Sequence, residues 1–326
     1  MNFKWKLHLL LFFVFILPIN VFAYSNKLIL GGENIGIHVD ASHILVVGFY
    51  DVDGKNIAED AGFAVGDQIL KVNNKDVWSI EEMMSEIDNE NATFSILRNG
   101  KRKDIELTLI KDKEGGLKSG LYVKDNIIGI GTLTYIDPET KIFGALGHEI
   151  MEQTTKKKLE IRKGEIFSSV VTDITKSDIG NVGEKNATFD IEDVYGNITS
   201  NESSGIFGIY NKPLKDKKII EVGKKNEIKK GKAQIMTVID KNNIETFQIN
   251  IIKIDDKAEV KNVLFELEDE KLKKKTNGIV SGMSGSPILQ DGKIVAAVTH
   301  AVIQDPMRGY GIFIETMLKE GDKSKE

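Results

Sequence analysis

Short hydrophobic runs that alternate with polar residues fill most of the chain after residue 28. A clear example is 233–239, which a turn at 240–243 separates from a second alternating run at 247–251. Period-two alternation bounded by turn residues predicts half-buried β-strands. Convincing helical periods are few, so the pattern predicts a mainly β protein.

Residues 28–110 predict a small module of strands and one helix. Five runs bounded by Gly, Asn or Asp predict strands at 35–39, 44–49, 68–72, 93–97 and 104–110. The helix begins after Ser79, which forms a capping box with Glu82. Its apolar stripe favours a core-facing surface over a ligand groove; it consists of Ile80, Met83, Met84 and Ile87.

A second, larger module follows a polar, Gly-rich joint at 111–120. Residues 121–320 carry many short strand patterns separated by Gly turns, which favour a β-barrel or a β-sandwich. A length of 326 residues agrees with two domains, each long enough to bury its own core.

The first 23 residues have the grammar of an export signal. Lys4 and Lys6 precede an apolar run at 9–17, and a Val-x-Ala sequence ends at Ala23. The apolar stretch continues far enough to span a bilayer as an uncleaved anchor. A cleaved signal peptide and a retained membrane anchor both stay open, and either one predicts an exported protein that associates with a membrane through this segment.

The composition excludes several kinds of ligand binding and catalysis. The net charge of −5 argues against a protein that binds nucleic acid mainly through its phosphates. The chain has no Cys, so it has no thiolate nucleophile and no Cys-ligated metal. A nucleophile in this protein must therefore be an oxygen or an amine.

The hexapeptide 282–287, Gly-Met-Ser-Gly-Ser-Pro, is the sharpest chemical feature. Glycines on both sides of Ser284 allow a tight turn that exposes its hydroxyl. Acyl transfer needs such a nucleophile together with two backbone donors for the oxyanion, here the amides of Gly282 and Ser284. The hexapeptide is similar to the nucleophile loop of chymotrypsin-like proteases, although an ordinary Gly/Ser turn fits it equally well.

Two histidines in the larger module are candidates for the general base. His148 ends an apolar strand 136 residues before Ser284, in the order found in chymotrypsin-like enzymes. His300 follows Ser284 by sixteen residues, where Thr299 and His300 are better placed to line the substrate site. We therefore expect His148 to be the base. No metal is expected, because the stretch from His148 has Glu152 where the His-Glu-x-x-His motif needs its second His.

Residues 61–73, Ala-Gly-Phe-Ala-Val-Gly-Asp-Gln-Ile-Leu-Lys-Val-Asn, resemble the most recognisable stretch of PDZ domains, including those of exported bacterial proteases. The resemblance implies a groove in which a peptide or a free C-terminus adds as a strand, its carboxylate held by a Gly-containing loop. That loop falls on Gly36 and Ile37, and the groove lies between 37–39 and the helix at Ile80.

Several longer motifs resemble the stage IV sporulation protein B peptidase of spore-forming bacteria. They are Leu-Tyr-Val-Lys-Asp at 121–125, Gly-Ile-Gly-Thr-Leu-Thr-Tyr at 129–135, Gly-Ala-Leu-Gly-His at 144–148, Gly-Ile-Val-Ser-Gly-Met-Ser-Gly-Ser-Pro-Ile at 278–288 and Val-Thr-His at 298–300. This family implies a PDZ module followed by a chymotrypsin-like double β-barrel, without a cofactor. It also implies a serine endopeptidase of the space between forespore and mother cell, which cuts itself and a membrane-bound regulator and so activates processing of a sigma-factor precursor.

Carried over by motif, Ser284 is the nucleophile, His148 the base and Asp269 the third member of the triad. Glu268 and Glu270 compete with Asp269, and a helix N-terminal charge is the alternative role for Asp269 itself. Two alternatives to the peptidase stay open. One is a catalytically inactive PDZ scaffold that holds a membrane partner, and the other is an esterase or acyl transferase with the same triad.

Overall fold

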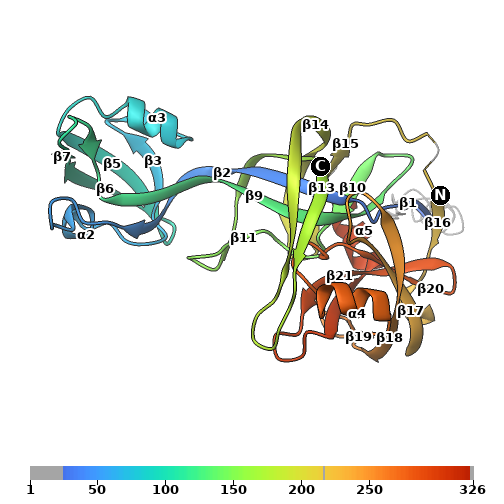
Figure 1. Ribbon diagram of the computed structural model, residues 1–326. Helices are drawn as coiled ribbons and strands as arrows, with labels where there is room; N and C mark the ends of the chain where they lie inside the picture. The colour runs from blue at the N-terminus through green and yellow to red at the C-terminus, as the bar shows by residue number, and fades with distance from the viewer. Residues whose placement is uncertain (1–24, 216, 324–326) are drawn as a thin grey trace, which may run out of the picture.

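The computed structural model describes residues 25–215 and 217–323 (Figure 1). The expected signal peptide or anchor, residues 1–23, lies outside this part of the chain. Within the described ranges, no helix is both long and apolar enough to cross a membrane.

Six antiparallel strands close the first of two β-barrels. In spatial order they are β2 (Asn34–Phe49), β9 (Leu121–Ile136), β10 (Ile142–Ala145), β15 (Gly205–Tyr210), β14 (Glu184–Glu202) and β13 (Ile161–Thr175), which pairs back onto β2. Alternate residues of these strands fill the interior; Ile35, Ile37, Leu133, Phe143 and Ile166 are all buried there. A short hairpin of β11 (Met151–Glu152) and β12 (Lys157–Lys158) extends from this barrel.

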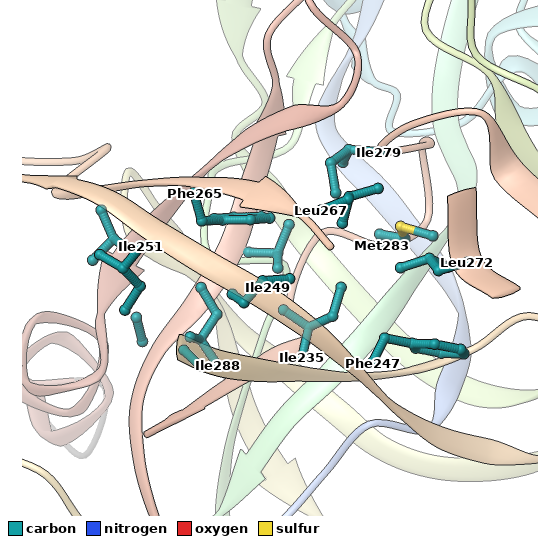
Figure 2. Packing of buried hydrophobic residues seen from close by; sticks show 14 of the residues in the cluster. Ile235, Phe247, Ile249, Ile251, Phe265, Leu267, Leu272, Ile279, Met283 and Ile288 are labelled. Carbon is teal, nitrogen blue, oxygen red and sulfur yellow. The ribbon is translucent and has the colours of Figure 1, made fainter. Parts of the chain in front are cut away.

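The second barrel also has six strands. Their order is β17 (Gly231–Val238), β18 (Ile244–Ile254), β19 (Val263–Leu267), β22 (Arg308–Phe313), β21 (Lys293–Ala301) and β20 (Pro287–Gln290), which pairs with β17. Figure 2 shows its apolar interior, to which α4 (Glu270–Thr276) contributes Leu272. The double β-barrel expected from the resemblance is therefore confirmed.

A small sheet ties the two barrels together. β1 (Lys27–Leu30) pairs with β9 of the first barrel and with β16 (Ile219–Val222), which in turn runs parallel to β21 of the second. The C-terminal helix α5 (Ile314–Lys323) buries Met317 and Leu318 in the same region, and a 3-10 turn, η1, spans Lys225–Glu227. Backbone pairing and apolar packing therefore connect the two barrels in this region.

The PDZ module has a hydrophobic core of its own. It contains α2 (Ile57–Ala61), β3 (Gln68–Val72), β4 (Lys75–Asp76), α3 (Ile80–Ser85), β5 (Asn91–Arg98), β6 (Lys101–Thr108), β7 (Ile110–Lys111) and β8 (Leu117–Lys118). Ser79 caps α3 as expected by accepting from Glu82 N at 3.1 Å, while the Glu82 carboxylate accepts from Trp78 N. Asn99 and Gly100 both have positive φ in the two-residue turn between β5 and β6, as a type I′ hairpin requires.

One expectation for this module is wrong. The strands expected at 35–39 and 44–49 are two halves of the single strand β2, and only the second half belongs to the PDZ core. The first half pairs with β13 and β9 in the first barrel. Figure 1 shows β2 and β9 as a two-stranded ribbon that links the two parts of the molecule. The PDZ module is therefore inserted between two strands of the first barrel.

Candidate active site

Ser284 lies in a tight loop between the two barrels. Ser286 N donates to Met283 O at 2.9 Å, and Gly285 between them has a φ of 92°, which favours glycine at this turn position. The Met283 side chain is fully buried in the core of the second barrel (Figure 2). This anchor fixes the loop while the residue beside it, Ser284, stays only partly buried.

Two threonines of β9 hold the loop from the first barrel. Thr132 N donates to Ser284 O at 2.9 Å, and Thr132 Oγ1 donates to Gly282 O at 2.8 Å. Thr134 Oγ1 donates to Gly285 O at 2.7 Å. The carbonyls of Gly282, Ser284 and Gly285 therefore all bond to β9, which fixes these three peptide groups.

The amides of the loop divide into two sets. Met283 N donates to Val280 O and Gly285 N donates to Val298 O. Within the described part of the chain, the amides of Gly282 and Ser284 have no hydrogen-bond acceptor. These are the two donors expected from the sequence for an oxyanion hole, and both remain available to a ligand.

A second tight turn brings His148 to this loop. Leu146 and Gly147 both have positive φ, so the chain reverses sharply after β10. A Cβ on Gly285 would lie 2.6 Å from Leu146 N, and one on Gly147 would lie 3.0 Å from Thr299 Cγ2. The turn before His148 therefore packs directly on the Ser284 loop and on β21.

The imidazole of His148 has the tautomer that a general base needs. Its Nδ1 lies 2.8 Å from the carbonyl oxygen of Glu149, so Nδ1 carries the proton and Nε2 keeps its lone pair. Burial lowers the pKa of His148, and this outweighs the bond to the Glu149 carbonyl and the Glu149 charge, which both raise it. His148 is therefore neutral at pH 7.

The hydroxyl of Ser284 has a different partner in this structure. Its Oγ donates to Thr299 O at 2.7 Å. A proton transfer to His148 requires this hydroxyl to leave the Thr299 carbonyl and turn toward the imidazole. In the described conformation the Ser284 hydroxyl therefore donates to the backbone and not to an imidazole.

The assignment of Asp269 as the acid that orients His148 is wrong for this structure. Asp269 is the N-cap of α4, and its Oδ1 accepts from Leu272 N at 3.0 Å. The partner of His148 Nδ1 is the Glu149 carbonyl instead. Asp269 therefore has the alternative role, a charge at a helix N-terminus followed by lysines in the last turn.

Thr299 and His300 reach the site in different ways. The Thr299 side chain is buried and its Oγ1 donates to Tyr310 O, so only its backbone carbonyl faces Ser284. The His300 ring lies 5.0 Å from that of His148, centroid to centroid. Burial, the nearby His148 and Lys261 lower the pKa of His300 to about 4. The neutral imidazole of His300 therefore lies beside the imidazole of His148.

Gly36 and Ile37 do not form the expected carboxylate-binding loop. Both lie inside β2 with strand partners on each side, and Ile37 is buried in the first barrel. The strand beside α3 is the first part of β9, where Asp125 Oδ2 accepts from Ile80 N at 2.8 Å and Leu121 packs in the PDZ core. This segment of β9 takes the place expected for 37–39.

Lys185 is a feature that the sequence did not reveal. It is 3% exposed, and its Nζ donates to Thr237 Oγ1 at 2.9 Å and to Asn34 Oδ1 at 3.4 Å. Burial lowers the pKa of Lys185 to about 7. A Cβ on Gly282 would lie 3.1 Å from Lys185 Cδ, so the Lys185 side chain packs against the backbone of the Ser284 loop. Lysines are mostly exposed, and no motif distinguishes this one.

Comparison with known families agrees with this geometry. A family model described as SpoIVB peptidase S55 matches residues 115–318, more than half of the chain. The chain belongs to this family. S55 membership makes the molecule a serine peptidase of sporulation, as the longer motifs suggested.

A PDZ domain model matches residues 34–109. The match begins in the first half of β2. This segment has the sequence of a PDZ strand, but in the structure it pairs with β13 of the first barrel. No curated protein matches the chain.

Proposed function

We propose that this S55 peptidase hydrolyses peptide bonds with Ser284 as nucleophile and His148 as general base. The proposal is supported chiefly by one observation. The loop of Ser284 packs on the turn of His148 and leaves the amides of Gly282 and Ser284 free. No metal or cofactor has a role in this chemistry.

The reaction follows the acyl-enzyme route. Ser284 Oγ attacks the carbonyl carbon while His148 Nε2 takes the hydroxyl proton, and the oxyanion accepts from Gly282 N and Ser284 N. His148 then gives the proton to the leaving amine, the C–N bond breaks, and an ester to Ser284 remains. Water attacks the ester with His148 again as base, which releases the acid and restores the hydroxyl.

The bond from His148 Nδ1 to the Glu149 carbonyl replaces the carboxylate of an ordinary triad. A carbonyl fixes the tautomer and the ring orientation, but it stabilises the imidazolium less than a full negative charge does. The charge of Glu149 supplies part of that stabilisation, since it raises the pKa of His148. We infer a moderately active peptidase that relies on positioning and on the oxyanion donors.

The setting proposed for this activity is extracytoplasmic. The export grammar of residues 1–23 and the family motifs support secretion into the space between forespore and mother cell. The substrates proposed there are the chain itself and a membrane-bound regulator whose cleavage activates sigma-factor processing.

The Ser284→Ala variant tests the assignment. Purified full-length wild type should react with a fluorophosphonate at Ser284 and accumulate a self-cleaved form, both of which mass spectrometry locates. Ser284→Ala should show neither, with an unchanged thermal unfolding curve. Self-cleavage at the wild-type rate in Ser284→Ala would exclude Ser284 as the nucleophile.

The same experiment addresses the two alternatives. An inactive scaffold predicts no label and no cleavage in wild type, and the bond from Ser284 Oγ to Thr299 O is the observation that favours it. An esterase or acyl transferase predicts a labelled Ser284 without any peptide cleavage.

A further inference from the structure

Most of β9 has a partner on one edge only. β2 pairs with β9 from Leu121 to Thr132 and β1 continues along that same edge at Tyr135 and Ile136, whereas on the other edge β10 pairs with Leu133–Ile136 alone. Within the described residues, the edge of 121–131 that faces away from β2 therefore has no strand beside it. An unpaired edge of this length is a template for strand addition.

The edge begins at the nucleophile. Thr132 N donates to Ser284 O, away from β2. Residues 126–132 pair with 34–40 without a register shift, so every second residue back from Thr132 points its N–H and C=O to the same side. Ile130, Ile128 and Asn126 thus continue the row of outward-facing backbone groups from Ser284.

The edge ends in the PDZ module. The segment 121–125 runs beside α3, to which Asp125 is bonded through Ile80 N. Leu121 and Val123 pack on the PDZ core, and Asp125 lies on the same side of the strand. That bond therefore crosses the face of the strand and not its edge. Glu152 of the β11–β12 hairpin contacts the ribbon at Lys124, and Glu160, which follows the hairpin, accepts from Ser42 N. Asn126 and Ile128 remain exposed.

We propose that the C-terminal segment of a protein substrate adds to this edge as one continuous antiparallel strand, from the Ser284 loop to α3. The proposal rests on the proposed peptidase function. β9 runs from the PDZ module toward Ser284, so an antiparallel partner runs the other way and delivers its free C-terminus to the PDZ end. This orientation agrees with the capture of terminal carboxylates by PDZ domains.

The length of the edge sets the distance to the cut. Residues 121–130 span roughly 34 Å at ~3.4 Å per residue. The scissile bond should therefore lie about ten residues before the C-terminus of the substrate. Tyr122 and Ile128 are 55% and 57% exposed along the edge, so apolar residues should be favoured opposite them.

The Ile128→Pro variant blocks the edge without breaking the barrel. Its N–H faces away from β2, so proline removes an outward donor and places its ring in the path of an added strand, while the β2 pairing persists. Ile128→Thr is the matched control, since it keeps the N–H and loses the apolar side chain. Thermal unfolding and fluorophosphonate labelling of Ser284 should be unchanged in both.

Reduced, unfolded casein with a free C-terminus serves as the substrate, beside a C-terminally amidated copy. Wild type should cut casein about ten residues from its end, and amidation or Ile128→Pro should slow that cut at least tenfold. Ile128→Thr should retain most of the rate. Equal rates and sites in wild type and Ile128→Pro would overturn the strand-addition proposal, and so would indifference to amidation. Failure of wild-type Ser284 to label would instead overturn the peptidase assignment.

Discussion

At the scale of single residues, the environment of Lys185 is the least expected from its chemistry. An ammonium group in the interior loses its hydration, and Lys185 has two neutral oxygen acceptors and, among the described residues, no carboxylate partner. The ammonium group of Lys185 therefore loses its proton more readily in the folded state than in the unfolded state.

This difference predicts a pH-dependent stability. The pKa of Lys185 falls from 10.5 to about 7 on folding, so the unfolded state binds more protons between these values and the free energy of unfolding rises with pH across them. Below pH 7 Lys185 is charged in both states, so the full cost of burying its charge lowers the free energy of unfolding. Lys185→Met should stabilise the protein at pH 7 by several kcal/mol, at about 1.4 kcal/mol per pKa unit, and flatten the rise. Urea unfolding at pH 7 and pH 10 measures both effects.

The exposed Lys232 of β17 provides the control for this measurement, because Lys232→Met removes a solvated lysine from a strand. It should leave the pH dependence intact. A rise between pH 7 and pH 10 that persists in Lys185→Met would show that other groups cause it.

Substitutions of Asp269 distinguish a helix cap from a catalytic acid. Asparagine caps helices about as well as aspartate, so Asp269→Asn should change neither stability nor kcat. Asp269→Ala should lose about 1 kcal/mol of stability with kcat within a few-fold. A fall in kcat near 10⁴-fold in Asp269→Asn, as expected for a triad acid, would restore the original assignment. Peptide hydrolysis and chemical unfolding of both variants decide the matter.

At the scale of elements, β9 joins the first barrel to the Ser284 loop. Its threonines contribute the hydrogen bonds to Gly282 O, Ser284 O and Gly285 O, which fix the peptide planes of the loop. The free amides of Gly282 and Ser284 belong to the adjoining peptide groups, whose carbonyls accept from Lys185 N and Ser286 N, so the threonines orient these amides through the neighbouring planes.

Thr132→Val removes one of these bonds at nearly constant volume. The buried carbonyl of Gly282 then lacks its donor, at a cost of about 1–3 kcal/mol, and the peptide plane is free to turn. We expect kcat/KM to fall roughly 10- to 100-fold, in proportion to that cost. Thr172→Val is the matched control, because Thr172 Oγ1 donates to Asn186 O away from the site. A wild-type kcat/KM in Thr132→Val would show that the remaining contacts suffice to orient the loop.

At the scale of the whole molecule, the PDZ module and the barrels have separate cores joined by the ribbon of β2 and β9. Asp40 lies opposite Asn126 at the point where the ribbon leaves the first barrel. The register of the first barrel therefore depends on residues before Asp40 and after Asn126. The PDZ core depends on the residues between these two positions.

Replacement of residues 40–126 by Asn-Gly joins the hydrogen-bonded pair Val39 and Ile127, and it should convert the ribbon into a tight hairpin. We expect this variant to unfold cooperatively, with the β-rich circular dichroism of the barrels, because no residue of their cores beyond Ala41 is removed. Differential scanning calorimetry beside the full chain measures this. Loss of a cooperative transition would mean that the barrels need the PDZ module in order to fold.

Much of the local structure and chemistry was predictable from short stretches of sequence. Alternation located β3 at 68–72, and the Asn99-Gly100 pair marks the turn between β5 and β6. Glycines on both sides of Ser284 predicted a tight loop with a free pair of amides. The candidate base, His148, follows an apolar strand and a Gly turn, which is where the structure has it.

Other features depended on contacts between distant segments. Gly36 and Ile37 have the pattern of a PDZ strand, and Asp269 resembles a triad acid by its family position, yet both have other partners here. Lys185 shows no sign in the sequence that it is buried.

The amino-acid sequence by itself determined where strands and turns form, because backbone conformation and side-chain alternation are set by neighbouring residues. Only the tertiary structure decided which strands pair, which carbonyl orients His148 and which edge of β9 stays open. A strand has two equivalent hydrogen-bonding edges, and its alternation specifies the buried face but not the partner, so packing of the complete chain makes that choice.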